Sequence, residues 1–194
     1  DCLDRCATVE EGVRLFETTP ITNGALLTLA DGRGDRAVVE RSCTTSRVRR
    51  TDEALLVTFN KYRHPDMERF EVPVGAVSAG LVPGIPLHES NLARQRRWDE
   101  LAPASGERFT EAEIRRCMTD HAGGRGDSNT ICRHADPLSE TLWSALLDTR
   151  RRTVRVVFGH ACSGPYVEYG IDGATPTLAG RASDRDAPEP MLHG

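Results

Sequence analysis

The sequence predicts an α+β domain, and three observations support this fold class. Capping-box patterns, each a Thr followed three residues later by a Glu, mark helix starts at Thr8 and Thr110. Short runs of β-branched and aliphatic residues, separated by turn residues, predict antiparallel hairpins. Helical and strand patterns come in blocks rather than in alternation, which favours α+β over a parallel α/β sheet.

The first complete helix is expected to follow Thr8, because the Thr8 and Glu11 side chains can each satisfy the other residue's backbone donor. Pro20 and the Asn-Gly pair after it end this helix. The apolar residues that share one helical face are Val9, Val13 and Phe16, with Leu15 beside them. Cys2, Leu3 and Cys6 precede the cap and have the pattern of the end of an earlier helix. The chain is therefore expected to begin inside an element, as the later part of a longer domain.

A hairpin is expected next, with strands at 26–30 and 37–40 around a turn at 31–35, and a third strand at 55–59. Residues 71–87 contain three prolines and predict a long irregular connection. A strongly basic helix is expected over 90–101.

The Thr110 capping box predicts a helix through about Met118, after which glycines at 123, 124 and 126 interrupt the chain. The remaining pattern predicts strands, which we place at 130–132, 141–147, 153–158 and 166–169. Residues 1–170 are thus interpreted as one domain, and 171–194, which lack periodicity, as a loose tail.

The composition narrows the function classes. Hydrophobic residues make up 38% and charged residues 28%, as in a globular domain with a solvated surface. The net charge is −4, so no nucleic-acid partner is expected. No apolar run approaches the roughly 20 residues that cross a bilayer, so no membrane partner is expected and a cytoplasmic location is favoured. No nucleotide-binding motif is present, and no cofactor is expected.

Six cysteines are scattered along the chain without a Cys-x-x-Cys pair, and we interpret them as mostly buried thiols. Cys132 and His134, together with His121, could suggest a metal site. However, one residue between Cys and His is not a usual zinc spacing, so a buried Cys beside an exposed His is favoured and no metal is expected.

Two Arg-Gly-Asp tripeptides occur, at 33–35 and 125–127. This tripeptide is known for integrin binding, but 24 arginines (25 basic residues less Lys61) and 17 glycines produce it easily by chance. Gly and Asp also shape turns, which is the favoured interpretation.

A set of stretches in a particular order resembles the later part of the C45 peptidase family, the acyl-CoA:6-aminopenicillanic-acid acyltransferase-like proteins. The resemblance covers roughly residues 1–170 and depends on order and spacing rather than on one motif. The stretches are 3–11, 26–31, 38–40, 57–62, 128–134, 141–144 and 158–162.

The resemblance implies an αββα N-terminal-nucleophile sandwich, of which this chain would be a part. In such proteins a precursor cleaves itself and exposes an N-terminal cysteine, whose thiol attacks an amide or thioester carbonyl. The α-amine titrates near neutrality, so it can accept the thiol proton without a histidine. The oxyanion that forms needs a hydrogen-bond donor placed beside it in advance.

Two site residues follow from the resemblance. Asn60 matches the family's oxyanion donor, although Lys61 replaces a histidine and one residue is inserted; the alternative is a turn asparagine. Arg133 matches an arginine near the site, the alternative being a surface strand arginine.

Ser139-Glu140 replaces the Ser-Arg pair of the penicillin enzymes, so a generic amide is the expected substrate. Arg94 could contact substrate, but a solvated helix face is favoured.

The nucleophile is expected upstream of this chain. Cys2 would require removal of Asp1, and it precedes the capping box, where the family has helix rather than the nucleophile strand. The expected function is therefore hydrolysis or acyl transfer on small amide or acyl substrates, in partnership with the N-terminal remainder of the same protein. The alternative is a non-enzymatic binding module or an inactive relative.

Overall fold

The computed structural model describes residues 2–53, 55–77, 86–102, 109–134, 140–170 and 177–178. The elements found within these ranges are α1 (Cys2–Arg5), α2 (Val9–Thr18), β1 (Ala25–Ala30), β2 (Arg36–Arg41), β3 (Ser46–Arg49), η1 (Pro65–Phe70), α3 (Leu87–Leu101), α4 (Glu111–Met118), β4 (Trp143–Asp148), β5 (Thr153–Phe158), β6 (Val167–Gly170) and β7 (Thr177–Leu178).

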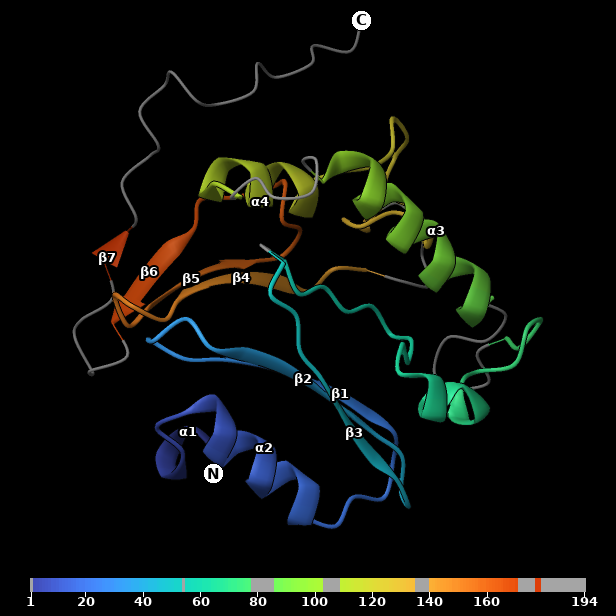
Figure 1. Ribbon diagram of the computed structural model, residues 1–194. Coiled ribbons are helices and arrows are strands. Elements are labelled where there is room, and N and C mark those ends of the chain that lie inside the picture. The colour runs from blue at the N-terminus through green and yellow to red at the C-terminus, as the bar shows by residue number, and fades with distance from the viewer. Residues whose placement is uncertain are drawn as a thin grey trace, which may run out of the picture.

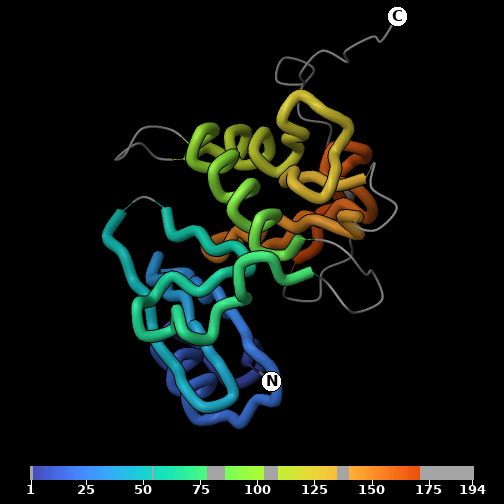
Figure 2. Tube along the Cα trace, turned by 90° about the vertical axis from the view of Figure 1, so that its right-hand side faces the viewer, coloured from blue at the N-terminus to red at the C-terminus, as the bar shows by residue number. Residues whose placement is uncertain are grey.

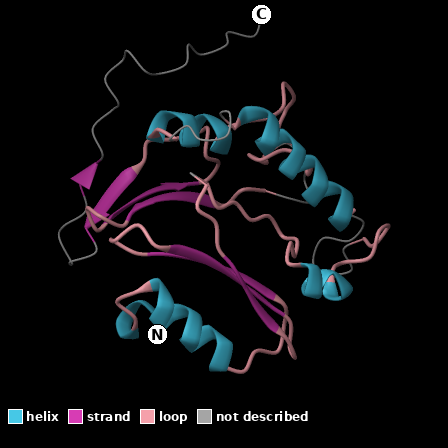
Figure 3. Ribbon diagram, viewed as in Figure 1, coloured by secondary structure: helices cyan, strands magenta, loops and turns pink. Residues whose placement is uncertain are grey.

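The strands form two antiparallel sheets, in the orders β1-β2-β3 and β4-β5-β6-β7. Helices α1 and α2 cover the outer face of the first sheet, the second sheet lies beyond its other face, and α3 and α4 lie further out (Figures 1 and 3). Figure 2 agrees, with the N-terminal elements at one end of the molecule and α4 with the second sheet at the other. The predicted α+β class is confirmed.

Helix α2 packs on the first hairpin as its apolar face predicts. Its capping box is formed, with the Glu11 amide donating to Thr8 Oγ1 and the Glu11 carboxylate accepting from the Thr8 amide. The predicted hairpin is also present, and Leu27 pairs with Val39 across it. The buried core consists of Val9, Val13, Ala37 and Val39, with Phe16, Leu27, Leu29 and Val48 packed around it.

The buried Asp31 joins this helix to the hairpin turn. One carboxylate oxygen accepts from the Val9 amide at the start of α2 at 3.1 Å, and the other accepts from the Arg33 and Asp35 amides at 2.9 and 3.2 Å. The bond from Val9, followed by those from the turn, lowers the pKa of Asp31. A single carboxylate therefore stabilises both elements only while it is ionised.

We expect acid to weaken this junction between α2 and the hairpin turn. The pKa of Asp31 in the folded state lies below its unfolded value of about 3.9, so the stabilisation is present above that value and is lost as pH falls through the folded pKa. In urea unfolding, Asp31→Asn should be less stable than wild type at neutral pH, with the difference shrinking below about pH 4. The exposed Asp35→Asn should retain the wild-type acid dependence, and parallel curves for wild type and Asp31→Asn would contradict this account.

The predicted third strand at 55–59 is wrong. Its place beside β2 is taken by β3, which starts after a tight turn in which Ser42 Oγ accepts from the Thr45 amide at 3.0 Å. This local turn closes a pairing across a few residues, whereas 55–59 would have to close a longer loop. Residues 55–64, which we call the crossing segment, contain no helix or strand and pass toward the second sheet; the Val57 carbonyl accepts from Arg49 Nη2 at 3.2 Å.

The buried Glu40 in β2 holds this crossing segment to the first sheet. One of its carboxylate oxygens accepts from Arg49 Nε at 2.8 Å. The other accepts from the backbone amides of Arg63 and His64, both at 2.9 Å. Glu40 is fully buried, so these bonds replace the water that the carboxylate loses on folding.

The two helices predicted after residue 86 are confirmed. Helix α3 begins at Leu87, three residues earlier than predicted, and α4 carries the capping box of Thr110 and Glu113. Of the irregular connection predicted over 71–87, residues 78–85 lie outside the described ranges. Among the described helices, none has the length and apolar character of a membrane span.

The second sheet contains the predicted hairpin. β4 and β5 pair from Trp143 with Phe158 to Asp148 with Thr153, and β6 pairs with β5. The strand predicted at 130–132 is wrong, because the Thr130 hydroxyl donates to the Asp127 and Cys132 carbonyls and holds this segment in a turn. β7 lies inside the predicted tail, whose other residues, 171–176 and 179–194, are outside the described ranges.

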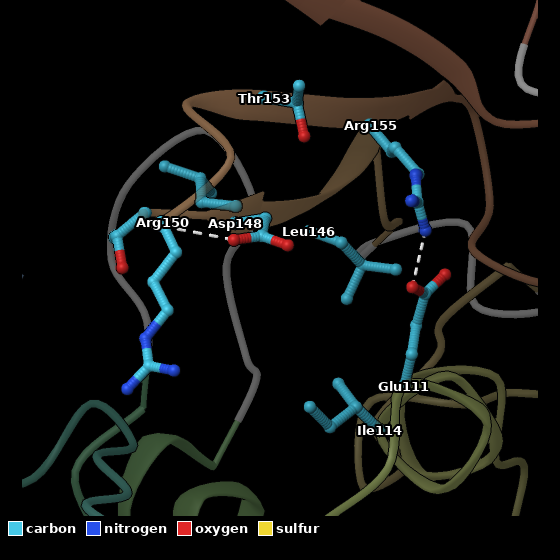
Figure 4. Close-up of a pocket in the computed structure, with 9 residues that line it drawn as sticks. Glu111, Ile114, Leu146, Asp148, Arg150, Thr153 and Arg155 are labelled. Carbon is cyan, nitrogen blue, oxygen red and sulfur yellow. Dashed lines mark hydrogen bonds and ion pairs between the residues drawn. The ribbon is translucent and has the colours of Figure 1, made fainter. Parts of the chain in front are cut away.

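One face of the second sheet is strongly apolar and partly exposed. Leu146 and Arg155 face α4, because both line the cleft between that helix and the β4–β5 hairpin (Figure 4). Side chains alternate along a strand, so Trp143, its partner Phe158 and Leu147 share one face of the hairpin by register. Their exposed fractions are 61%, 66% and 72%.

Candidate active site

Arg133 lies against α3 through a buried serine. Its Nη2 donates to Ser90 Oγ at 3.0 Å, and the Ser90 hydroxyl donates to the Ser128 carbonyl at 2.6 Å. Ser90 is buried on the first turn of α3, whereas Arg133 is half-buried. Arg133 is therefore not a surface strand arginine, because it belongs to no strand and its guanidinium lies against α3.

Asn60 is held by the next residue of the same helix. The buried Asn91 donates from Nδ2 to the Asn60 backbone carbonyl at 2.6 Å, and Asn91 Oδ1 accepts from Arg94 Nη2. The Asn60 residue itself is exposed at the end of the crossing segment. Helix α3 thus brings both predicted site residues to one place, with Asn91 anchoring Asn60 and Ser90 anchoring Arg133.

Arg94 adds a second cation to this place. Burial, and then the charge of Arg133, lower the pKa of Arg94 to about 10. Its guanidinium lies 6.0 Å from the Phe59 ring centroid, and its buried Nε has no hydrogen-bond partner among the described residues. The expectation that Arg94 lies on a solvated helix face is therefore wrong, because α3 packs this residue against Phe59 and near Arg133.

We call Asn60, Ser90, Asn91, Arg94 and Arg133 the α3 cluster. It holds two guanidinium groups and the exposed Asn60, while the Ser90 hydroxyl and the Asn91 amide are engaged in positioning them. Guanidinium groups bind carboxylates and other anionic oxygens. A separate cleft of about 260 Å³ lies between the crossing segment and the later part of α3; Leu55, Leu56 and Trp98 line it together with charged residues such as Arg49 and Asp99. The Phe59 ring meets Trp98 edge to face at 6.4 Å. The two guanidinium groups of the cluster can therefore bind an anion, and the Phe59 ring connects Arg94 to Trp98 at the cleft.

The cysteines whose pKa is shifted are not activated for nucleophilic attack. Burial raises the pKa of the Cys2 and Cys117 thiols, and it raises that of Cys132 to about 11. Cys2 lies in α1 on the outer face of the first sheet, whereas α3 lies beyond the second (Figure 1). The interpretation of Cys2 as a helix cysteine is confirmed.

Two other features of the described residues offer no rival site. In the cleft beside α4, Arg155 is already paired with Glu111 and Glu168, and Asp148 accepts from the amides of its own turn (Figure 4). Both Arg-Gly-Asp tripeptides lie in turns, as the turn interpretation predicts.

The structure gathers a set of sulfur and imidazole ligands that the sequence interpretation dismissed. One ligand atom from each lies within 4.8 Å of all the others; the residues are His121, Cys132, His134 and Cys162. His134 is half-buried and faces this group, so the interpretation as an exposed histidine is wrong. The spacing of Cys132 and His134 does not predict this set, because Cys162 lies 28 residues beyond His134 and only the fold brings it near.

The protein is thus an α+β protein in which one helix, α3, holds a cationic, amide-bearing cluster of side chains. Residues 2–162 match the family described as acyl-coenzyme A:6-aminopenicillanic acid acyl-transferase. The chain belongs to this family, as the resemblance predicted, and the membership indicates acyltransferase or hydrolase activity in general. A comparison with curated proteins finds no match.

Proposed function

We propose that this chain is the later part of an N-terminal-nucleophile amidase or acyltransferase whose nucleophile is a cysteine encoded upstream of Asp1. The observation that carries the proposal is the family match over residues 2–162, together with the meeting of Asn60 and Arg133 on α3. The stacking of two antiparallel sheets between helices supports an αββα sandwich of this class.

The apolar face of the second sheet supports an upstream partner. Trp143, Leu147 and Phe158 are each more than 60% exposed and lie on one face. Apolar side chains gathered on one sheet face are normally covered by another layer. We propose that strands of the N-terminal remainder cover this face and bring the nucleophile toward the α3 cluster.

The reaction would use the upstream cysteine in two steps. Its α-amine takes the thiol proton, and the sulfur attacks the substrate carbonyl to give a tetrahedral oxyanion. Asn60 Nδ2 donates a hydrogen bond to that oxyanion, while Arg94 and Arg133 bind an anionic group of the substrate. The carbon–nitrogen bond then breaks, the departing amine takes the proton, and water or an acceptor amine releases the acyl group.

The test is to compare the complete gene product with residues 1–194 alone. The complete protein should cleave itself before a cysteine, as seen by intact mass, and should release acyl product from simple amides. Replacing that upstream cysteine by alanine should abolish both properties, because the thiol performs both attacks. Residues 1–194 alone should be inactive.

Two results would contradict this proposal. Acyl release by residues 1–194 alone would exclude an upstream nucleophile, and its loss in Cys2→Ala would transfer the role to Cys2. An uncleaved, inactive complete protein would favour the alternative of a binding module. The matched control is Cys43→Ala, which replaces an exposed cysteine and should leave activity unchanged.

A further inference from the structure

The four-ligand group found beside Arg133 comes from two loops. His121 lies at the start, and Cys132 and His134 at the end, of the loop that follows α4; Cys162 lies in the turn after β5. Backbone bonds close the first loop on itself, because the Cys132 amide donates to the Asp120 carbonyl at 3.1 Å and the His134 amide to the Gly126 carbonyl at 2.8 Å. The convergence is thus set by the backbone.

All six separations between the ligand atoms are within 4.8 Å, and three of them can be compared with those of a tetrahedral zinc ion. The two sulfurs are 3.8 Å apart, Cys162 Sγ is 3.6 Å from His134 Nε2, and the two histidine Nε2 atoms are 2.8 Å apart. With Zn–S of about 2.3 Å and Zn–N of about 2.0–2.1 Å, tetrahedral angles require about 3.8, 3.5 and 3.3 Å. Two of the three agree, and the third needs the imidazoles to separate by about half an ångström.

The surroundings leave little freedom to the ligands. Gly126 has a φ of +87°, and a Cβ there would lie 3.0 Å from the Cys132 carbonyl oxygen and 3.1 Å from the His134 ring. The His160 ring centroid lies 4.7 Å from that of His134, and His160 Nε2 donates to the Glu140 carboxylate at 2.5 Å. Asp120, beside His121, is held by two bonds from Arg97. These contacts pack against His134 and fix the backbone beside His121.

We propose that His121, Cys132, His134 and Cys162 bind one zinc ion. Thiolate and imidazole ligands in tetrahedral arrangement select zinc among the abundant divalent ions. All four positions are taken by protein, so the site is structural and supplies no metal-bound water. On binding, the two thiols lose their protons to solvent, and no change of oxidation state occurs.

The proposed zinc would also position Arg133. This residue stands between two ligands in the chain, and its guanidinium reaches Ser90 of α3. Zinc would therefore fix the segment that carries Arg133 in the α3 cluster, a consequence that rests on the proposed function. Metal binding itself does not rest on it.

The test is metal analysis of reduced protein expressed with zinc. We expect one zinc per chain, and cobalt exchange should give the visible bands of a tetrahedral thiolate site.

Cys132→Ser and Cys162→Ser should each lose the metal. Cys162 is exposed, so its variant remains informative if Cys132→Ser fails to fold. Cys117→Ser, which replaces a buried cysteine outside the group, should keep it. A chelator should lower the Tm of wild type but not of Cys162→Ser.

Two outcomes would overturn the proposal: folded, reduced wild-type protein without zinc or cobalt bands, or a Cys132–Cys162 disulfide in its place, seen as the loss of two hydrogens by intact mass. Metal content is measured without an activity assay. If the complete gene product binds zinc but neither cleaves itself nor releases an acyl group, the zinc proposal stands and the enzymatic one falls. If the complete gene product releases acyl groups but binds neither zinc nor cobalt, the enzymatic proposal stands and the zinc one falls.

Discussion

Replacing Asn60 by alanine in the complete enzyme should lower kcat by about 10²–10³-fold, the usual cost of removing one oxyanion donor. The Asn60 side chain is exposed at the end of the crossing segment, while Asn91 fixes its backbone carbonyl at 2.6 Å. The amide is thus available to substrate on an anchored backbone. The bond to oxygen is strong only when negative charge develops, so kcat should fall while KM changes little.

Steady-state kinetics on a simple amide would measure this effect. Intact mass must first show that Asn60→Ala is fully cleaved, because self-cleavage forms an oxyanion as well. The matched control is Asn129→Ala, which removes an exposed turn asparagine of the loop leading to Arg133 and should keep the wild-type kcat. An unchanged kcat in a cleaved Asn60→Ala protein would leave Asn60 as a turn asparagine.

Replacing Glu40 by alanine should destabilise the protein by about 3–5 kcal/mol, as expected when one partner of a buried ion pair is removed. The change deletes the carboxylate that accepts from Arg49 at 2.8 Å and from two backbone amides at 2.9 Å. Arg49 would keep its charge in a largely buried place, and the crossing segment would lose its tie to β2. The same segment carries Asn60, so the α3 cluster should loosen as well.

Urea unfolding followed by circular dichroism would measure this loss, and Glu40→Gln, which keeps the shape, serves if Glu40→Ala does not fold. The matched control is Glu10→Ala, which breaks the ion pair of Glu10 with Arg50, whose side chains are 58% and 47% exposed. That variant should unfold as wild type does, because water already solvates both charges. Equal stability of the Glu40 and Glu10 variants would show that Glu40 holds nothing in place.

Local elements were predictable because their signals lie within a few residues. The capping boxes at Thr8 and Thr110 specify helix starts through bonds that span three residues, and both are present. The hairpin turns at 31–35 and 148–151 likewise depend on neighbouring residues. The strand predicted at 55–59 failed because an apolar run has no intrinsic partner, and the nearer β3 had already paired with β2.

The candidate site likewise contains some residues that the sequence predicts and others that only the fold brings together. Asn60 and Arg133 could be named from the order of stretches that the family shares, but nothing in either stretch indicates Ser90, Asn91 or the burial of Arg94. The Cys-x-His pair alone predicted a buried thiol, and only the turn after β5 adds Cys162 as a ligand.

By itself, the sequence determined the α+β class, its two capped helices and the family, because these depend on short-range bonds and on the order of segments. Tertiary structure alone decided which charges are buried, how α3 joins Asn60 to Arg133, and which loops supply the sulfur and imidazole ligands. Those properties arise from contacts between residues that are distant in the chain, such as Asn60 with Asn91 and Cys132 with Cys162, and such contacts form only when the layers pack.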